Sequence, residues 1–398
     1  MYLSAAEAAR RLGVSRTTLY SYVSRGLVGS HGTSGTRERR YSAADVEAMV
    51  QRKRARRDPN AAAAEALGVR GLPVLESALS SIDEGVLRYR GRDVIALAKD
   101  LPRRAEGGAL EAVAELLWGG PLPEDPAPVV AGPLRRALAG MPLIEGMHTW
   151  LAAAGAADGA AHNLKPDSVR ATGARILRGV TQTAAARSVK GMSVAEGLAS
   201  AWCPASDVTA RSRIDAALVL CADHELNVSA FTARCVASAR GTPYMVVTAA
   251  LAALHGHRHG GETERAAALI DEEGTPGAVL AARLRRGEHI PGFGHPLYPD
   301  GDPRGRLLLA LARKGASTTR IRGFARAGRS LLSAHPTLDL GLVALCRSMQ
   351  LPPHAPLALF AIGRTIGWVA HALEQYEREP MIRPRARYVG PEPTDAPL

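Results

Sequence analysis

The chain has 398 residues, of which 46% are hydrophobic and 22% charged, and its formal net charge is +12. This composition is typical of a folded globular protein, and the length predicts two or three domains. No stretch of about 18 uncharged apolar residues occurs, so we expect no membrane span. The first residues, MYLSAAEAARRLG, lack the basic and then apolar run of a secretory signal, so we expect a cytoplasmic protein.

Aromatic residues make up only 4% of the chain, so alanine, leucine and valine must fill most of the core. Alanine and leucine favour helices, which predicts an all-α protein. The cysteines are far apart and form no CxxC pair. We expect reduced core thiols rather than a disulfide framework or a zinc site.

The first 58 residues hold more than half of the excess positive charge, with 12 basic and 5 acidic residues. Within them, the segment SAAEAARRLGVSRTTLYSYVSRG predicts two short helices around a tight turn. Ser4 followed by Glu7 forms a capping box, Gly13 permits the turn, and Ser15 can cap the second helix. This pattern predicts a helix-turn-helix, whose second helix enters the major groove of DNA.

The segment ARRLGVSRTTLYSYVSRGL, with RRYSAADV further on, resembles MerR-type regulators. The resemblance places four side chains where bases or phosphates are met, namely Arg16, Thr17, Thr18 and Tyr20. It also implies a basic wing for the phosphate backbone, made of Arg37, Arg39 and Arg40. Double-stranded DNA is therefore a possible partner. The alternative is a small helical domain that docks on the rest of the chain or on a partner, with solvated arginines.

The motif Asp58-Pro59-Asn60 ends the basic module and predicts a linker. Residues 85–98 predict a short extended segment that runs into a helix. From about residue 107 onward, apolar residues recur at spacings of three and four. This spacing indicates a series of amphipathic helices separated by glycine and proline.

Three histidine-bearing segments stand out in the helical part. Asp223, His224, Glu225 and Asn227 interrupt an otherwise apolar helix, where burial of so many polar groups requires partners. The segment LHGHRHGGETE contains glycines that allow the backbone to approach a ligand closely. The segment IPGFGHPLYPDGDPRGR is a proline- and glycine-rich loop that presents His295.

Each of these segments alone has a simpler interpretation. His255, His257 and His259 could form a metal-binding tract, although no HExxH helix or neighbouring cysteine accompanies them. A lone histidine is by default a hydrogen-bonded structural residue. The GFGH turn matches neither GxxxxGKS/T nor GxGxxG, so nucleotide-binding loops of these two kinds are excluded.

A longer series of motifs runs in order from residue 70 to residue 391. The motifs are ESALSSIDEGVLRYRG, ADHELN, HGGE, GFGH with DPR, HPTLD, FAIGRTIGWVAH and IRPRARYVG. Together they resemble the citrate synthase family. The resemblance implies an all-α body that follows the helix-turn-helix domain of residues 1–58. Its large domain would span residues 59–260 and 351–398, and its small domain residues 261–350.

The resemblance also implies the chemistry, because the family joins the methyl carbon of an acyl-CoA to the ketone of oxaloacetate and then hydrolyses the thioester. Asp339 corresponds to the base, His259 to the hydrogen-bond donor for the enolate oxygen, and His295 to the donor that polarises the ketone. The implied oxaloacetate-binding residues are His224, Arg304 and Arg383. The segment implied to take the CoA adenine, largely through backbone groups, is Ile290, Pro291, Gly292, Phe293 and Gly294. We expect no metal and no bound prosthetic group.

The sequence departs from the family pattern at several positions. Glu262 stands in HGGET where many relatives have HGGAN, and its carboxylate would favour the charged form of His259 if it pointed that way. Pro296 and Pro299 stand where many relatives carry basic residues that help to hold CoA. Cys221 replaces a histidine of some branches.

The C-terminal tail GPEPTDAPL contains no arginine, although family members often supply one there to the neighbouring subunit. Arg385 or Arg387 could take this role, or oxaloacetate binding is weaker or altered. Arg364 and Trp368 are interpreted as packing and scaffold rather than as chemistry.

We therefore expect a homodimeric synthase that condenses acetyl-CoA or propionyl-CoA with oxaloacetate to give citrate or 2-methylcitrate and CoA. The alternative is a DNA-binding transcriptional regulator whose synthase-like body senses oxaloacetate or an acyl-CoA. The retained proton-transfer residues favour the enzyme, and the altered HGGET and the short tail favour the sensor. Closure of the small domain over the substrate would gate the chemistry, and a dimer would also suit paired DNA half-sites.

Overall fold

The structure is a computed structural model of the chain. It describes residues 2–24, 28–32, 39–43, 45–46, 49–50, 75–104, 107–124, 137–138, 140–205, 207–378, 381–384 and 390. The chain divides into two compact units, Met1–Glu76 and Ser77–Leu398. The predicted linker at Asp58-Pro59-Asn60 lies outside the described residues.

The N-terminal unit combines the two predicted helices, α1 (Ala5–Leu12) and α2 (Arg16–Ser24), with a three-stranded antiparallel sheet. The sheet has the order β1 (Tyr2–Leu3), β3 (Arg39–Ser42) and β2 (Ser30–Gly32). The strands β2 and β3 pair antiparallel, so Arg39 and Arg40 of the predicted basic wing lie on a strand of this sheet.

The predicted helix signals of this unit are confirmed. The Ser4 hydroxyl accepts from the backbone N–H of Glu7, and the Glu7 carboxylate accepts from the backbone N–H of Ser4. Gly13 ends α1 with φ +61°, a conformation that glycine adopts without strain. Ser15 accepts from the backbone N–H of Thr18 and so caps α2.

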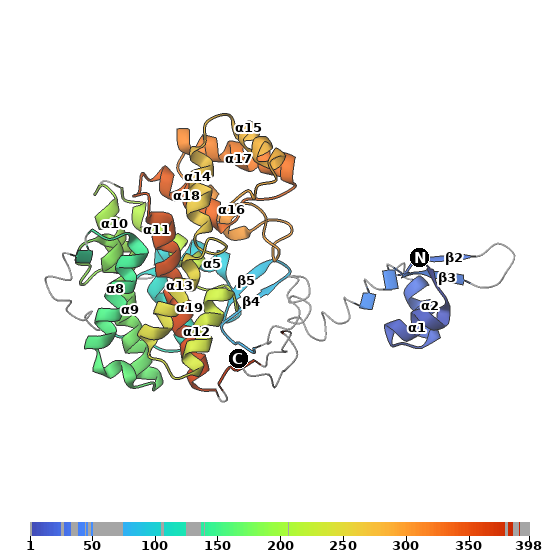
Figure 1. Cartoon of the computed structure of the whole chain (residues 1–398), viewed down its shortest axis with the longest axis horizontal. Helices are drawn as coiled ribbons and strands as arrows, with labels where there is room; N and C mark the ends of the chain where they lie inside the picture. The colour runs from blue at the N-terminus through green and yellow to red at the C-terminus, as the bar shows by residue number, and fades with distance from the viewer. Residues whose placement is uncertain are drawn as a thin grey trace, which may run out of the picture. The chain divides into compact units, whose positions relative to one another are not determined.

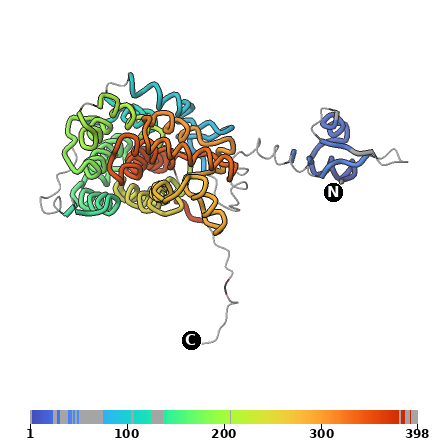
Figure 2. The backbone as a smooth tube through the Cα atoms, turned by 90° about the horizontal axis from the view of Figure 1, so that it is seen from above, coloured from blue at the N-terminus to red at the C-terminus, as the bar shows by residue number. Residues whose placement is uncertain are grey.

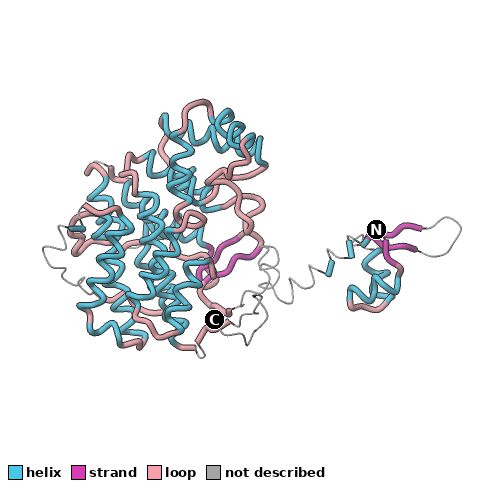
Figure 3. Tube along the Cα trace, in the orientation of Figure 1, coloured by secondary structure: helices cyan, strands magenta, loops and turns pink. Residues whose placement is uncertain are grey.

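The C-terminal unit is mostly helical and contains one small antiparallel sheet (Figure 3). Its strands are β4 (Ser80–Asp83), β5 (Val86–Tyr89) and β6 (Arg92–Asp93). The helices from the start of the unit are α5 (Val94–Arg104), α6 (Ala109–Trp118), α8 (Leu143–Ala157), the 3₁₀ helix η1 (Gly159–His162), α9 (Pro166–Ala185), α10 (Val194–Trp202), α11 (Ala210–Cys221), α12 (Val228–Ser238) and α13 (Pro243–His255). Those that follow are α14 (Glu262–Asp271), α15 (Pro276–Arg285), α16 (Pro303–Leu311), α17 (Ala316–Leu332), α18 (Leu338–Ser348) and α19 (Ala355–Tyr376).

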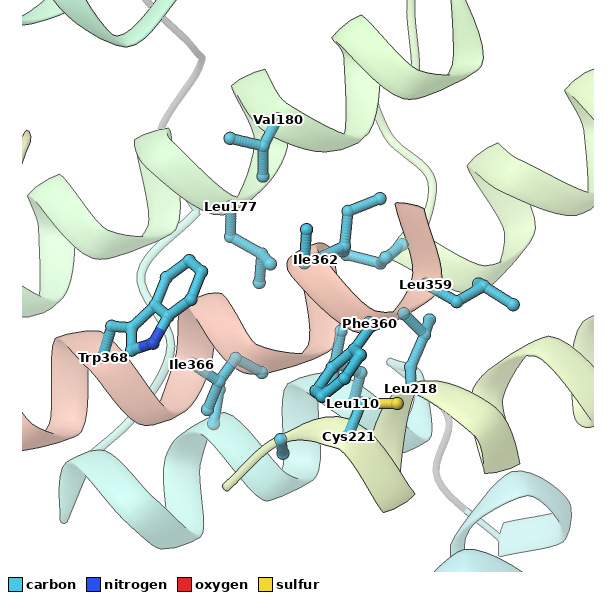
Figure 4. Close-up of a cluster of buried hydrophobic side chains, with 14 of the residues drawn as sticks. Leu110, Leu177, Val180, Leu218, Cys221, Leu359, Phe360, Ile362, Ile366 and Trp368 are labelled. Atoms are coloured by element: carbon cyan, nitrogen blue, oxygen red, sulfur yellow. The ribbon is translucent and has the colours of Figure 1, made fainter. Parts of the chain in front are cut away.

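The helix α19 forms the centre of the larger hydrophobic core. It runs inside the bundle in both views, with α9, α11, α12 and α13 packed against it (Figures 1 and 2). Its apolar side chains meet those of neighbouring helices, as Phe360 and Ile366 do with Leu218 and Leu110 (Figure 4). Among the described residues, α19 is the one helix long and apolar enough to cross a membrane, but 94% of its apolar window is buried inside the protein. It is therefore the core helix of this unit.

A second, smaller core lies in the segment from α14 to α18. Its buried side chains, from Ala266 to Ala344, form a cluster of their own, and these helices gather at one end of the unit (Figure 1). The cluster falls within residues 261–350, the range predicted for the small domain. Because this segment has its own core, it can act as a packed body within the larger unit.

The predicted extended segment of residues 85–98 is confirmed as β5 and β6 followed by α5. One local prediction is wrong. Asp223, His224 and Glu225 do not interrupt a helix, because α11 ends at Cys221 and α12 begins only at Val228. Asn227 is the N-cap of α12, and its side chain accepts from the backbone N–H groups of Ser229 and Ala230. The polar residues therefore form a loop whose side chains reach different partners. Asp223 accepts from the hydroxyl of Ser80, His224 bonds to Tyr298, and Glu225 accepts from the backbone N–H of Ile82.

Candidate active site

His224 and His295 meet around a tyrosine. The imidazole of His224 lies in the loop between α11 and α12, and its Nε2 forms a 2.9 Å hydrogen bond with the hydroxyl of Tyr298. The ring of His295, from the loop before α16, lies edge-on to the ring of His224, with 5.2 Å between centroids. Tyr298 also contacts the His295 ring, with 5.0 Å between centroids. Two segments 71 positions apart, 224 and 295, are thereby brought together.

Arg304 joins the same cluster and is held rigidly. Its guanidinium lies 5.3 Å from the centre of the Tyr298 ring. Asp302 accepts from Nε and Nη2 of Arg304, at 3.0 and 2.9 Å, and from the backbone N–H of Leu338. The Nη1 group of Arg304 makes no hydrogen bond within the described part of the chain. A fork fixed on one side in this way suits a carboxylate on the other.

The three candidate histidines of the site are held in the neutral form. Burial, and then the charge of Arg304, lower the pKa of His295 to about 4. Burial, and then the charge of Arg364, lower the pKa of His259 to about 3. The pKa of His224 is also well below its usual range, through burial and then through Arg304, His295, Arg364 and His259. Each of these imidazoles is therefore a neutral hydrogen-bonding group at neutral pH.

The hydrogen bonds of His295 define its tautomer. The backbone N–H of Leu297 donates to Nδ1 of His295 over 3.2 Å. A neutral ring that accepts at Nδ1 carries its proton on Nε2. His295 is therefore a hydrogen-bond donor through Nε2.

His259 lies in the turn between α13 and α14 and is fixed by a serine. Its Nε2 forms a 2.9 Å hydrogen bond with the hydroxyl of Ser229, and its ring packs edge-on against Phe360. The same hydroxyl accepts from Nε1–H of Trp368 and lies 2.8 Å from Oδ1 of Asn227. Ser229 can donate to Asn227 or to His259. When it donates to His259, the neutral ring carries its proton on Nδ1, which is then a donor for a ligand.

Asp339 lies in the first turn of α18 and carries an unused oxygen. Its Oδ2 accepts from the hydroxyl of Thr337 at 3.1 Å, whereas its Oδ1 is buried and has no hydrogen-bond partner among the described residues. Burial, and then the charge of Glu262, raise the pKa of Asp339 to about 7. A buried carboxyl with a free oxygen and a pKa near neutrality has the properties of a general base.

The structure connects Asp339 to the histidine cluster through shared neighbours rather than by direct contact. Arg304 and Asp302 act electrostatically on both Asp339 and His295. Asp302 also accepts from the backbone N–H of Leu338, the residue before Asp339. No hydrogen bond joins Asp339 to either His259 or His295, both of which are described residues. A substrate would have to lie between them.

Arg364, which the sequence predicts to be a packing and scaffold residue, is a buried cation. Its Nε donates to the carbonyl of Cys221, its guanidinium lies 5.0 Å from the centre of the Phe360 ring, and its Nη1 is buried without a partner. An unpaired buried guanidinium is costly unless a ligand completes it. Arg364 is therefore a further candidate for binding a carboxylate.

Glu262 does not act on His259 in the expected way. Its Oε1 accepts from the backbone N–H of Gly292 at 3.0 Å and bonds to His289 at 2.8 Å. The pKa of His259 is lowered rather than raised. The carboxylate is therefore turned toward the loop that precedes His295.

The loop from Ile290 to Gly294 is tightly bound to the rest of the protein. The backbone N–H of Gly294 donates to the carbonyl of His335, and the carbonyl of Gly292 accepts from the N–H of Thr337. Gly292 and Gly294 have positive φ angles of 82° and 72°. The two glycine amides are thus used inside the protein.

Arg383 is exposed, and no hydrogen bond or ion pair joins it to the other candidate residues in the described part of the chain. Arg385 and Arg387 lie outside the described residues. Within the described part of the chain, no group of three or more histidine, cysteine or acidic side chains has the arrangement of a metal site, and His255 and His257 belong to none.

Comparison with known proteins decides the family. Residues 68–385 match the family model described as "Citrate synthase, C-terminal domain", and residues 2–54 match the model described as "Helix-turn-helix domain". The first match spans most of the chain. The chain belongs to the citrate synthase family.

Individual citrate synthases support this membership. "Citrate synthase 2" of Bacillus subtilis is 28% identical over 366 residues, which cover 82% of this chain and 96% of the relative. "2-methylcitrate synthase" of Shewanella oneidensis is 35% identical over 190 residues, 45% of this chain and 51% of the relative. A solved ternary complex of the Thermoplasma acidophilum citrate synthase with carboxymethyl coenzyme A and oxaloacetate is 25% identical, with a TM-score of 0.68, and covers 84% of this chain and 98% of that one. The fold and the enzyme class, an acyltransferase of the citrate synthase type, follow from these matches.

The helix-turn-helix unit of this citrate synthase family member exposes part of the predicted DNA-binding set. Arg16 and Thr17 are exposed on α2, and Tyr20 has an exposed fraction of 52%. Thr18 is half-buried, and its hydroxyl is hydrogen-bonded to Ser15. Two wing residues, Arg39 and Arg40, are exposed on β3, and Arg37 lies outside the described residues.

Several residues of the candidate site could not be assigned a contact from the sequence. Tyr298 and Asp302 lie within a quoted motif, but their partners are known only once the chain has folded. Ser229 follows Asn227 in a segment that was interpreted as helix interior. Arg364 had a signal, since it is the one charged residue in the apolar run LALFAIGRTIGWVA.

Proposed function

We propose that this member of the citrate synthase family condenses acetyl-CoA with oxaloacetate and releases citrate and CoA, with propionyl-CoA as the alternative acyl donor. The observation that carries the proposal is the buried, unpartnered Oδ1 of Asp339, whose carboxyl has a pKa of about 7. Such a group can remove a weakly acidic proton and later return it at neutral pH.

In the proposed reaction, Asp339 takes a proton from the methyl group of the thioester. His259 donates a hydrogen bond to the enolate oxygen that develops. The new carbon–carbon bond forms at the ketone carbon of oxaloacetate, and the ketone oxygen takes the proton from Nε2 of His295 to become the hydroxyl of the product. Water then cleaves the thioester, and CoA leaves as the thiol. The proton held by Asp339 is released when the thioester is cleaved, and His295 regains a proton from water. No metal or prosthetic group is required in this sequence, because the fixed dipoles of neutral imidazoles stabilise the developing charge.

The cations of the site fit the two carboxylates of oxaloacetate. Among the described residues, the hydrogen bonds of the Arg304 side chain use Nε and Nη2, and the buried Nη1 of Arg364 has no partner. His224 and Arg304 both contact Tyr298, His224 by a hydrogen bond to the hydroxyl and Arg304 by its guanidinium over the ring. Arg383, which is exposed, would act on the site of a second subunit in the homodimer that we propose.

The test is release of free CoA thiol by the full-length protein with oxaloacetate and either acyl-CoA. We expect the wild type to release thiol and Asp339→Asn to lower kcat at least about 10²-fold. Asp300→Asn removes an exposed carboxylate of the same region and should leave the rate unchanged. If the wild type binds both substrates but releases no thiol, the body is a sensor, as in the alternative function.

A second function, DNA binding, is supported by the helix-turn-helix match and by the exposed Arg39 and Arg40. We propose that the N-terminal unit contacts double-stranded DNA with α2 and with this wing. Binding should weaken steeply as salt is added, because phosphate contacts release counterions. The double variant Arg39→Ala and Arg40→Ala should weaken binding and reduce the slope of log affinity against log salt by about 2. A slope near zero for the wild type would rule out phosphate contact.

A further inference from the structure

Glu262 is placed where three segments of the active site meet. It is the first residue of α14, three positions after His259. Its Oε1 accepts from the backbone N–H of Gly292, in the middle of the loop from Ile290 to Gly294. The carbonyl of the same Gly292 accepts from the N–H of Thr337, two positions before Asp339.

These bonds form a continuous path between the histidine turn and the base. The path runs from His259 along the chain to Glu262, across to Gly292, and across again to Thr337 and Asp339. The backbone at Gly292 is closely packed. A Cβ added there would lie 3.1 Å from the Cβ of Leu340 and 3.2 Å from the Cβ of Ala266. A shift of Gly292 would therefore move the loop and the start of α18 together.

Other groups fix Glu262 in this position. His289, at the start of the loop, bonds to the same Oε1 at 2.8 Å, and Nη1 of Arg265 lies 3.4 Å from Oε2. The side chain of Glu262 is only 17% exposed, whereas that of His289 is 56% exposed. The carboxylate thus lies inside the fold and is held from three sides.

We propose that Glu262 is a positioning residue that fixes the Ile290–Gly294 loop relative to Asp339 and so sets the geometry in which acyl-CoA binds. This inference rests on the proposed function. It assigns a role to a residue that departs from HGGAN, the pattern of many relatives. An alanine at position 262 has no acceptor for the Gly292 amide.

The charge of Glu262 has a second effect, because it opposes ionisation of Asp339. The other groups acting on the Asp339 carboxyl are Asp302 and Arg304 at the start of α16 and the hydroxyl of Thr337. The charge of the same carboxyl also contributes to the raised pKa of the buried Cys221 thiol on α11. On α17, Arg320 donates to the backbone carbonyls of Ile270 and Gly274, and Arg322 donates to that of Leu309.

The experiment compares four variants of the full-length protein. Glu262→Gln keeps an acceptor for Gly292 but removes the charge, and Glu262→Ala removes both. Glu264→Gln makes the same charge change at an exposed position of the same helical turn. His289→Ala removes one partner of Glu262 but leaves the Gly292 bond. The measurements are KM for acetyl-CoA, the pH profile of kcat/KM, and titration calorimetry with CoA.

We expect Glu262→Ala to raise KM for acetyl-CoA and the Kd of CoA about tenfold, because the buried amide of Gly292 loses its acceptor. Glu262→Gln should keep both values near the wild type while its acid limb moves to lower pH, because the negative charge that raises the pKa of Asp339 is gone. His289→Ala should leave the acid limb in place, and Glu264→Gln should change neither quantity.

The inference is overturned if Glu262→Ala binds CoA as the wild type does, or if Glu262→Gln is as defective as Glu262→Ala. An unmoved acid limb in Glu262→Gln would remove the electrostatic effect. A wild type that releases no thiol would contradict the proposed function alone, since the CoA titration still tests the positioning role.

Discussion

The surroundings of the Asp339 carboxyl disfavour its negatively charged form. It is enclosed, one oxygen has no partner, and Glu262 adds a like charge nearby, so its pKa rises to about 7. In an unfolded chain the same group has its ordinary pKa of 3.8. The site therefore holds its base ready for a proton at a cost to the stability of the folded protein.

This cost can be measured with Asp339→Asn. Between pH 4 and pH 7 the unfolded chain releases the proton and the folded chain keeps it, so the carboxyl destabilises the fold increasingly as pH rises. We expect the variant to be more stable than the wild type by about 1–4 kcal/mol at pH 8 and by little at pH 4.5. Thermal unfolding at the two pH values checks this, with Asp300→Asn as the control that should show no such difference. A variant that is less stable at pH 8 would mean that the carboxyl is stabilised by contacts in the free protein.

The same pKa sets the working range of the enzyme. If Asp339 is the base, kcat/KM should fall as pH drops below about 7, because the protonated carboxyl cannot accept the proton. The neutral imidazoles do not titrate in this range, since burial keeps the pKa of His259 and of His295 at about 3 and about 4. An acid limb near pH 4 would identify a group with an ordinary carboxyl pKa as the base.

At the scale of elements, the close approach of α16 and α18 brings Arg304 and Asp339 into one site. A side chain at Gly341 of α18 would come within 2.9 Å of the Gly305 Cα and 3.0 Å of the Leu308 Cβ on α16. Each helix begins with a functional residue, Arg304 in the first turn of α16 and Asp339 in the first turn of α18. Small residues at the crossing therefore determine the distance between these two side chains.

We expect Gly341→Ala to lower the free energy of unfolding by about 1–3 kcal/mol, because the added methyl group overpacks the crossing. Alanine would by itself favour the helix by about 1 kcal/mol, so the overpacking must exceed this gain. Denaturant unfolding and kcat/KM for oxaloacetate are the measurements, and both should fall. Gly277→Ala in α15, where an added Cβ meets nothing within 4 Å, is the matched control. A stabilised Gly341→Ala would show that the two helices can separate freely.

At the scale of the whole molecule, the sequence was sufficient for the fold but not for the site's internal contacts. The capping box of Ser4 and Glu7 is a local sequence pattern. The helical body is predicted from the resemblance of the motif series to a known family. The contact of Glu262 with Gly292 spans 30 positions and involves a backbone amide, for which no side-chain pattern exists. The helix predicted through Asp223 was wrong because an apolar run continues on both sides of the loop, and the capping tendency of Asn227 was the signal against it.

Three neutral histidines make the folded protein sensitive to acid. Their pKa values lie below the ordinary value of 6.5, so the unfolded chain binds protons that the folded chain does not. The stability that His224, His259 and His295 contribute is present above pH 6.5 and is lost as pH falls toward 4. Relative to the wild type, His224→Gln should therefore gain stability in denaturant as pH falls from 7 to 5, because the opposite effect of the Asp339 carboxyl is common to both proteins. A difference in stability between His224→Gln and the wild type that does not change over this range would contradict neutral burial of the His224 ring.

The central claim is that Asp339, His259 and His295 face one substrate pair from three sides. A crystal structure of the protein with oxaloacetate and carboxymethyl coenzyme A tests it most directly, because that unreactive analogue places a carboxyl group beyond the sulfur. The account predicts Oδ1 of Asp339 within about 3 Å of that group and the His295 Nε2 at a similar distance from the ketone oxygen of oxaloacetate. An Asp339 carboxyl turned away from both ligands would contradict it.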